Sequence, residues 1–261
     1  MNKTKIKNII LIFLVSLCGM YFIINYMNSG VEEDFFTDLY LYLWNGNLNI
    51  LFFLIFLVIF HEVCVMDSYK KIYNNFARLI ITRIGYKGFY KKEFKDICIK
   101  SFYYYYLLHI ILIIFCIFKY GFMTSTNLGL FKYHIFVNDP IIDLILFIII
   151  SSLGVAIFNC FIFSLSTFIK NIYLYRFIPL VLLFVTILFS TVFSTFIQNI
   201  FGYDIFIKTL GQTFMITSLI QPGMGFMMLG FLNFGLAASV FIIISAILIK
   251  ISINKRMKFD E

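Results

Sequence analysis

The chain has 261 residues, of which 62% are hydrophobic and 13% are charged, and its formal net charge is +8. An ordinary soluble domain has about 25% charged and about 45 to 50% apolar residues, so this composition excludes one. It indicates an all-α integral membrane protein. The positive charge does not by itself indicate nucleic-acid binding, because basic residues also orient membrane segments.

Six apolar runs are long enough to cross about 30 Å of hydrocarbon at about 1.5 Å per residue. They lie at residues 8–27, 49–66, 102–118, 141–167, 177–196 and 230–249. The first run follows the basic segment MNKTKIKN, as in a signal peptide, but no small-x-small cleavage site stands at its end. We therefore expect a retained first span, with a cleaved signal as the alternative, and one membrane domain over residues 1–261.

The basic residues are distributed unevenly among the segments that separate these spans. Eighteen lie in one set of alternate segments: the N-terminus, the loop between spans two and three, the segment after span four and the C-terminus. The other set holds Lys119, Lys132 and Lys208, and its first loop is acidic. The excess of Lys and Arg on one side predicts that both termini are cytoplasmic.

Aromatic residues flank two of the predicted spans. Tyr40, Tyr42 and Trp44 precede the second span, and the run Tyr103 to Tyr106 begins the third. Amphipathic rings favour the headgroup level, so we expect these residues in an interfacial belt.

The segment between spans five and six is unlike an ordinary loop. Its sequence MITSLIQPGMGFMML is too apolar to be solvated, and Pro222 and Gly223 interrupt it. Backbone that is not helical is tolerated at membrane depth where protein covers it. The pattern predicts a re-entrant pair of short helices, with a loop lying flat on the interface as the alternative.

Small residues recur at a spacing of four within two of the spans. They are Ser152, Ala156 and Cys160 in the fourth span and Gly235 and Ser239 in the sixth. This spacing lets helices approach closely in lipid, so we expect close packing there.

Motifs for catalysis or nucleotide binding are missing from the chain. A zinc protease that begins with His61-Glu62 needs a second His at the position of Val65. A CAAX-type protease has an EExxxR motif, but Thr37 stands where Glu32-Glu33 would require the Arg. The segment GYKGFYKKE is no phosphate loop, and the five cysteines have no paired spacing. We expect no metal, no cofactor and no enzymatic activity.

Three polar residues within the spans are candidates for a functional role. Intramembrane ionisable residues are functional candidates by default, which selects His61 and Glu62. A membrane enzyme built on these two is a further alternative. Asn159 is the carboxamide deep in the fourth span, where it either hydrogen-bonds to an adjacent helix or faces a path. His109 and His134 have no partner suggested by the sequence, so we interpret them as isolated.

The basic stretch NNFARLIITRIGYKGFYKKEFKDICIKS, residues 74–101, has an ordered internal pattern. Asn74 and Asn75 suit helix N-caps and Gly85 suits the position after a helix end. Between them, Phe76, Leu79, Ile80 and Ile84 share one helix face. The pattern predicts a short amphipathic helix, a turn at Gly85, and a charged helix over residues 89–100 that continues into the third span.

With these features the chain resembles the membrane subunits of ABC-2 type transporters. The resemblance rests on the six spans with both termini inside, on Glu62 near the end of the second span, on Arg78 and Arg83, and on Lys92 or Lys95. It implies a cytoplasmic ABC ATPase subunit that binds ATP, and a second permease subunit. It also implies a coupling helix between spans two and three and a re-entrant hairpin between spans five and six.

The resemblance also implies which residues contact the ATPase. These are Phe76, Arg78, Leu79, Arg83, Tyr86 and Lys87. The chain departs from larger members in having almost no cytoplasmic helix before the first span. It looks like the short permeases of Gram-positive bacteria that are linked to peptide or bacteriocin export, which implies the bacterial cell membrane. The alternative is a non-transporting immunity or sensor protein whose basic loop binds anionic lipid.

Overall fold

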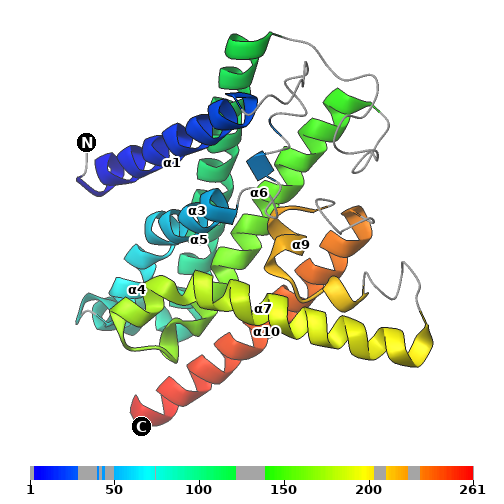
Figure 1. The fold of residues 1–261 in the computed structure, drawn as a ribbon. Coiled ribbons are helices and arrows are strands. Elements are labelled where there is room, and N and C mark those ends of the chain that lie inside the picture. The colour runs from blue at the N-terminus through cyan, green and yellow to red at the C-terminus, as the bar shows by residue number, and fades with distance from the viewer. Residues whose placement is uncertain are drawn as a thin grey trace.

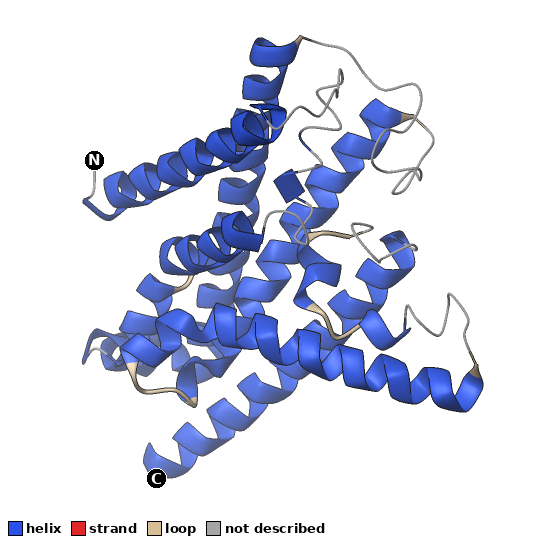
Figure 2. Cartoon of the chain, viewed as in Figure 1, coloured by secondary structure: helices blue, strands red, loops and turns tan. Residues whose placement is uncertain are grey.

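The computed structural model describes residues 3–28, 40, 43–44, 50–73, 75–121, 139–202, 210–222 and 230–260. Within these ranges the regular structure is helical and no strand occurs, as expected (Figures 1 and 2). The elements are α1 (Lys3–Asn28), α3 (Ile50–Cys64), α4 (Met66–Tyr73), α5 (Asn75–Tyr120), α6 (Pro140–Ser164), the 3-10 turn η1 (Leu165–Thr167), α7 (Ile172–Phe201), α9 (Ile216–Ile220) and α10 (Gly230–Asp260).

Five of these helices are long and apolar enough to cross a membrane. Their apolar stretches are Ile6–Asn25, Ile80–Lys119, Ile141–Thr167, Ile172–Phe201 and Phe231–Asn254. The helices α3 and α4 meet at an angle of 47° and would form a sixth span if the bent pair crosses as one. At about 1.5 Å per residue, α3 alone reaches only about 22 Å. The described residues thus have the architecture of a multi-pass helical membrane protein with five or six spans.

The helix α5 covers both the basic stretch and the third predicted span. Its backbone breaks at Gly85, where φ is 70° and ψ is 165°, and it is helical from there to Tyr120. This left-handed φ favours glycine, because a Cβ would clash with the following carbonyl oxygen. The turn at Gly85 and the continuous helix after it agree with the sequence pattern. The apolar stretch of α5 begins well before residue 102, where the third span was predicted to start.

Side-chain caps define where α6 and α7 begin. The Asp139 carboxylate accepts hydrogen bonds from the backbone N–H groups of Ile141 and Ile142, at 2.9 and 3.0 Å. The Asn171 side chain accepts from Tyr173 and Leu174 in the same way, at 2.9 and 3.2 Å. Each cap satisfies N–H groups that have no partner within the helix.

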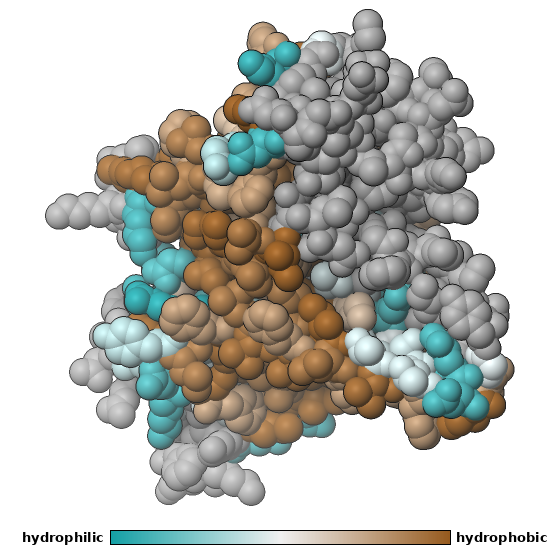
Figure 3. All heavy atoms as spheres, in the orientation of Figure 1, coloured by the Kyte–Doolittle hydropathy of each residue, from teal (hydrophilic) through white to brown (hydrophobic). Residues whose placement is uncertain are grey.

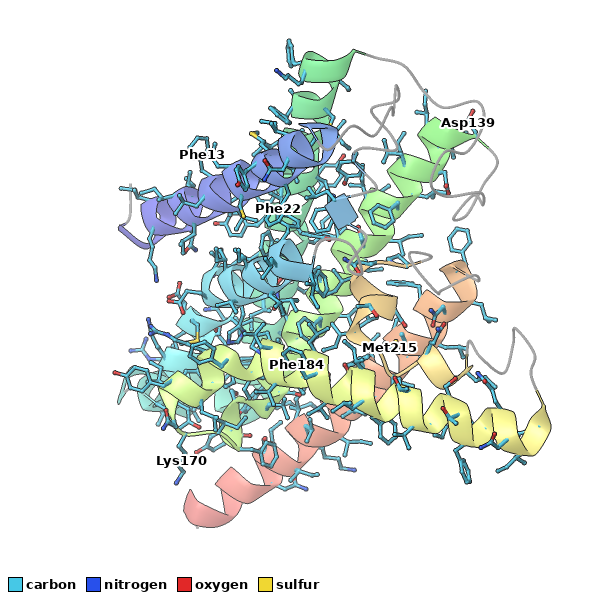
Figure 4. All side chains as sticks on the ribbon, in the orientation of Figure 1. Phe13, Phe22, Asp139, Lys170, Phe184 and Met215 are labelled. Atoms are coloured by element: carbon cyan, nitrogen blue, oxygen red, sulfur yellow. The ribbon has the colours of Figure 1, made fainter. Side chains whose placement is uncertain are left out.

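The helix α6 is central, whereas α7 lies at the periphery (Figure 1). In an apolar 18-residue window of α6, 61% of the residues are buried, against 11% in that of α7. Phe184, labelled in Figure 4, is 53% exposed, and Leu188 is 68% exposed. Figure 3 shows a broad apolar surface over the face that contains α3 and α7, with hydrophilic side chains at its edges. Lipid would cover such a surface in a bilayer.

The short helix α9 is buried against α6. A Cβ added to Gly154 would lie 1.9 Å from the carbonyl oxygen of Leu219, so only glycine permits this backbone contact. The spacing did not select Gly154, but the expected close packing of this span is confirmed at Ser152 and Ala156, which are each 0% exposed. α9 occupies part of the segment predicted to be re-entrant, and residues 223–229 lie outside the described residues.

The predicted close packing at Gly235 on α10 does not occur among the described residues of this chain. Within the described part of the chain, nothing lies within 4 Å of the point where a Cβ at Gly235 would stand. Ser239, one turn later, is exposed and donates its hydroxyl to the Gly235 carbonyl. Spacing alone did not identify the packed face, because small residues also occur on faces that contact no helix.

The predicted aromatic belt is also wrong for three of its members. Tyr40, Trp44 and Tyr105 are each 0% exposed. By contrast, Tyr103 is 59% exposed, as an interfacial ring would be. The three buried rings pack around a histidine in the core, so tertiary contacts override the interfacial preference of their residue type.

Candidate functional site at the basic end of the bundle

The helix α4 is anchored to the connection between α6 and α7. The Tyr69 hydroxyl shares its hydrogen between the carbonyls of Ile169 and Lys170, at 3.0 and 2.9 Å. The Tyr73 hydroxyl donates to the Ser166 carbonyl at 2.6 Å. These carbonyls follow the end of α6, where helices leave acceptors without partners in the backbone. Figure 4 labels Lys170 here and Asp139 at the opposite end of α6.

A buried carboxylate joins α4 to α5. The side chain of Glu93 is 2% exposed, and Lys71 Nζ lies 2.9 Å from both of its oxygens. The Ser68 hydroxyl donates to Glu93 Oε2 at 2.6 Å. A buried charge is tolerated only when it is paired and hydrogen-bonded, and both conditions hold here. The contact fixes α5 to α4 just after the break at Gly85.

The first turns of α5 after Gly85 are amphipathic. Phe89, Tyr90, Glu93 and Ile97 are buried against the rest of the bundle. The other face is exposed and basic, with side chains of Lys87, Lys91, Lys92 and Lys95. The spacing of the buried set follows one helix face, so the lysines point outward by periodicity.

A second carboxylate links three helices at the end of α3. Lys7 Nζ on α1 lies 2.8 Å from Glu62 Oε1, and Arg176 Nε on α7 lies 3.3 Å from Glu62 Oε2. The Glu62 side chain is 19% exposed, whereas those of Lys7 and Arg176 are 53% and 39% exposed. Glu62 is therefore a partly solvated junction between helices that are far apart in sequence.

His61 lies beside this junction and is 1% exposed. Its ring centroid is 5.1 Å from that of Tyr175, which stacks in turn on Tyr69 at 4.0 Å with an angle of 16° between the rings. The Tyr175 hydroxyl donates to the Ile162 carbonyl at 3.0 Å. His61 thus packs in a column of rings that connects α3, α7 and α4.

The residues expected to contact an ATPase fall into two groups. The side chains of Phe76, Arg78 and Leu79 lie outside the described residues, although the backbone there is helical. Arg83 and Lys87 are exposed and Tyr86 is partly buried, on either side of the break at Gly85. The exposed members are accessible to another protein.

The third polar candidate, Asn159, lies apart from Glu62 and His61. It is 2% exposed on α6 and donates from Nδ2 to the Ser101 hydroxyl on α5, at 3.0 Å. This is the first of the two alternatives drawn from the sequence, a hydrogen bond to an adjacent helix. The neighbouring Cys160 thiol lies 3.8 Å from the Phe94 carbonyl of the same helix, α5.

His109 is not isolated, contrary to the sequence interpretation. The Tyr40 hydroxyl bonds to His109 Nδ1, and the Ser151 hydroxyl lies 3.2 Å from His109 Nε2. The rings of Tyr105 and Trp44 lie 4.2 and 4.7 Å from the imidazole. The signal that could have identified this cluster is the position of an ionisable residue within a span, the criterion that selected His61.

The described polar groups of this region hold helices to one another. Among the described residues, no three His, Cys, Asp or Glu side chains are grouped so that they could hold a metal ion. Glu62 and Glu93 are each paired with a cation from another helix. Glu93 ties the basic segment to α4, α4 is tied to the connection between α6 and α7, and Glu62 separately joins α3 to α1 and α7.

Comparisons with known proteins identify no family for this chain. No family model matches the chain, and searches of curated proteins and of solved structures also find no match. The chain is a helical protein of the multi-pass membrane type, with five or six helices able to span.

Proposed function

We propose that the protein is the membrane subunit of an ABC-2 type exporter in a bacterial cell membrane. In this proposal it pairs with a second permease subunit, and a separate cytoplasmic ATPase binds and hydrolyses the ATP. The cargo in this proposal is an amphipathic or apolar molecule, a peptide of the bacteriocin kind. The long apolar helices and the basic amphipathic start of α5 support this assignment.

One observation carries the proposal more than any other. The basic segment is attached to the bundle after Gly85, where Glu93 pairs with Lys71 of α4, and α4 is attached to the connection between α6 and α7. A force applied to residues 75–88 by a partner would therefore reach α6 and α7 through fixed polar contacts. A basic loop that only attracts lipid headgroups needs no such attachment.

Two buried carboxamides beside α9 support a cargo path in that region. Gln221 and Asn233 are 3% and 0% exposed, and within the described residues Gln221 Nε2 and both amide atoms of Asn233 have no hydrogen-bond partner. Buried polar groups without partners are costly, and a polar cargo group or water passing beside α9 would supply the partners.

Reconstitution tests the proposal directly. The tagged chain is purified from its host in mild detergent, and the proteins bound to it are identified by mass spectrometry. We expect an ATPase with a phosphate loop, and ATP-dependent accumulation of a labelled amphipathic peptide in inverted vesicles that hold both proteins. Repeated recovery of the chain without any ATPase would contradict the proposal.

A charge-reversal pair locates the contact. R78E/R83E should release the ATPase, because both arginines lie in the segment before Gly85. K92E/K95E is the matched control, since it reverses the same number of charges on the exposed face of α5 after Gly85 and should retain the ATPase. Equal binding by both variants would show that the contact lies elsewhere.

A further inference from the structure

An open groove lies between the start of α5 and the end of α10. Its volume is about 530 Å³, and its apolar wall includes Tyr90 and Phe94 from α5 and Ile249 and Ile253 from α10. α5 runs away from the end of the molecule that holds the C-terminus, while α10 runs toward it (Figure 1). The two helices that form the groove are therefore antiparallel.

Three lysines stand along the groove. Lys87 and Lys91 are one helical turn apart on α5, and Lys250 lies across the groove on α10. No Asp or Glu is among the lining residues. Within the described part of the chain, none of the three ammonium groups forms an ion pair, whereas Lys7 and Lys71 do. The groove thus combines an apolar wall with unneutralised positive charge.

A groove with positive charge and an apolar wall suits a ligand that has both an anionic part and an apolar part. The positive charges favour an anionic head group, and the apolar wall favours a hydrocarbon chain. The volume falls within the range of about 300 to 1,000 Å³ that is usual for ligand pockets. A free phosphate ion would leave the apolar wall exposed, and a neutral lipid would leave the lysines without a counter-charge.

We propose that this groove is a binding site for one anionic membrane phospholipid. The lipid phosphate contacts Lys91 and Lys250, and an acyl chain lies against Phe94 and Ile249. Basic pockets between membrane helices bind anionic head groups in this way. Bound there, the lipid bridges α5 and α10. The site does not depend on the proposed transport function, because it needs no partner protein.

The test is native mass spectrometry of the full chain from nanodiscs that contain phosphatidylglycerol and phosphatidylcholine. We expect retained phosphatidylglycerol on the wild-type chain and a loss of affinity of about thirtyfold in K91Q/K250Q, because two of the three favourable charges are removed. K92Q/K95Q removes the same charge from the exposed face of α5 outside the groove and should retain the lipid.

A second variant leaves the charge unchanged. I249W fills the apolar wall and should displace phosphatidylglycerol while keeping all three lysines. Equal retention by K91Q/K250Q and wild type would overturn the proposal. An equal loss in K92Q/K95Q would also overturn it, since that would reflect general surface charge. Retention of phosphatidylcholine in equal amount would exclude an anionic site.

Discussion

Two groups of polar side chains in this bundle are stabilised by different kinds of contact. Glu62 and Glu93, at the basic end, are held by cations, and the paired cations remain partly exposed. His109, within the core, is held by hydroxyl groups and aromatic rings, and its environment is fully buried. The carboxylates thus lie where their paired cations reach solvent. The histidine lies where none of its contacts reaches solvent, and its hydrogen bonds go to uncharged groups.

The hydrogen bonds at His109 can be assigned as one continuous series. A neutral imidazole has one donor and one acceptor. The Tyr40 hydroxyl donates to Nδ1, Nε2–H donates to the Ser151 hydroxyl, and that hydroxyl donates to the Ile148 carbonyl at 3.2 Å. The side chains of Tyr40, His109 and Ser151 thus each have a hydrogen-bond partner without any ion, which suits a low-dielectric interior.

The largest effect should come from removing the cation beside the buried carboxylate. K71M leaves Glu93 buried with only the Ser68 hydroxyl, and should reduce the free energy of unfolding by about 3 kcal/mol. K71M/E93Q should recover at least half of that loss, because it removes the unpaired charge. The measurement is equilibrium unfolding in detergent. A K71M midpoint equal to that of wild type would mean that solvent already screens Glu93.

Removal of the imidazole should have the next largest effect. H109F leaves the buried hydroxyl of Tyr40 without its partner and should cost about 2 kcal/mol. F118L is the control, since Phe118 is 87% exposed on the same helix and should tolerate the change. Equal or greater stability of H109F would show that the hydroxyl chain contributes nothing to the fold.

A smaller, salt-dependent effect is expected at Glu62. E62Q removes the ion pairs to Lys7 and Arg176 and should cost about 1 kcal/mol at low ionic strength. The difference from wild type should shrink as salt is added, because partly exposed charges are screened. The loss in H109F should not depend on salt. Parallel salt responses of E62Q and H109F would remove the distinction between the two clusters.

The smallest effect should come from Lys7, whose side chain is 53% exposed. K7Q should cost about 0.3 kcal/mol, since exposed ion pairs contribute little. K92Q is its matched control, because Lys92 is exposed and has no ion-pair partner among the described residues. A loss of unfolding free energy in K7Q as large as that in E62Q would show that Lys7, and not Arg176, accounts for the stabilisation by Glu62.

Much of the helical architecture follows from the sequence, but most of the polar contacts do not. Apolar runs and the glycine at residue 85 act on the local backbone, so the helices and the break between them were predictable. The bend between α3 and α4 was not predicted, and neither was the contact of α9 at Gly154. Both depend on what packs against a helix rather than on its own periodicity.

The sequence by itself determined that this chain forms long apolar helices with positive charge concentrated in alternate segments. Those properties depend on the residue types of short stretches of sequence, so they can be predicted without knowing the tertiary structure. Only the tertiary structure decided that Glu62 meets Lys7 and Arg176, and that His109 meets Tyr40 and Ser151. These partners come from different segments of the chain, and side-chain pairing between distant segments depends on how the helices pack, which no local pattern encodes.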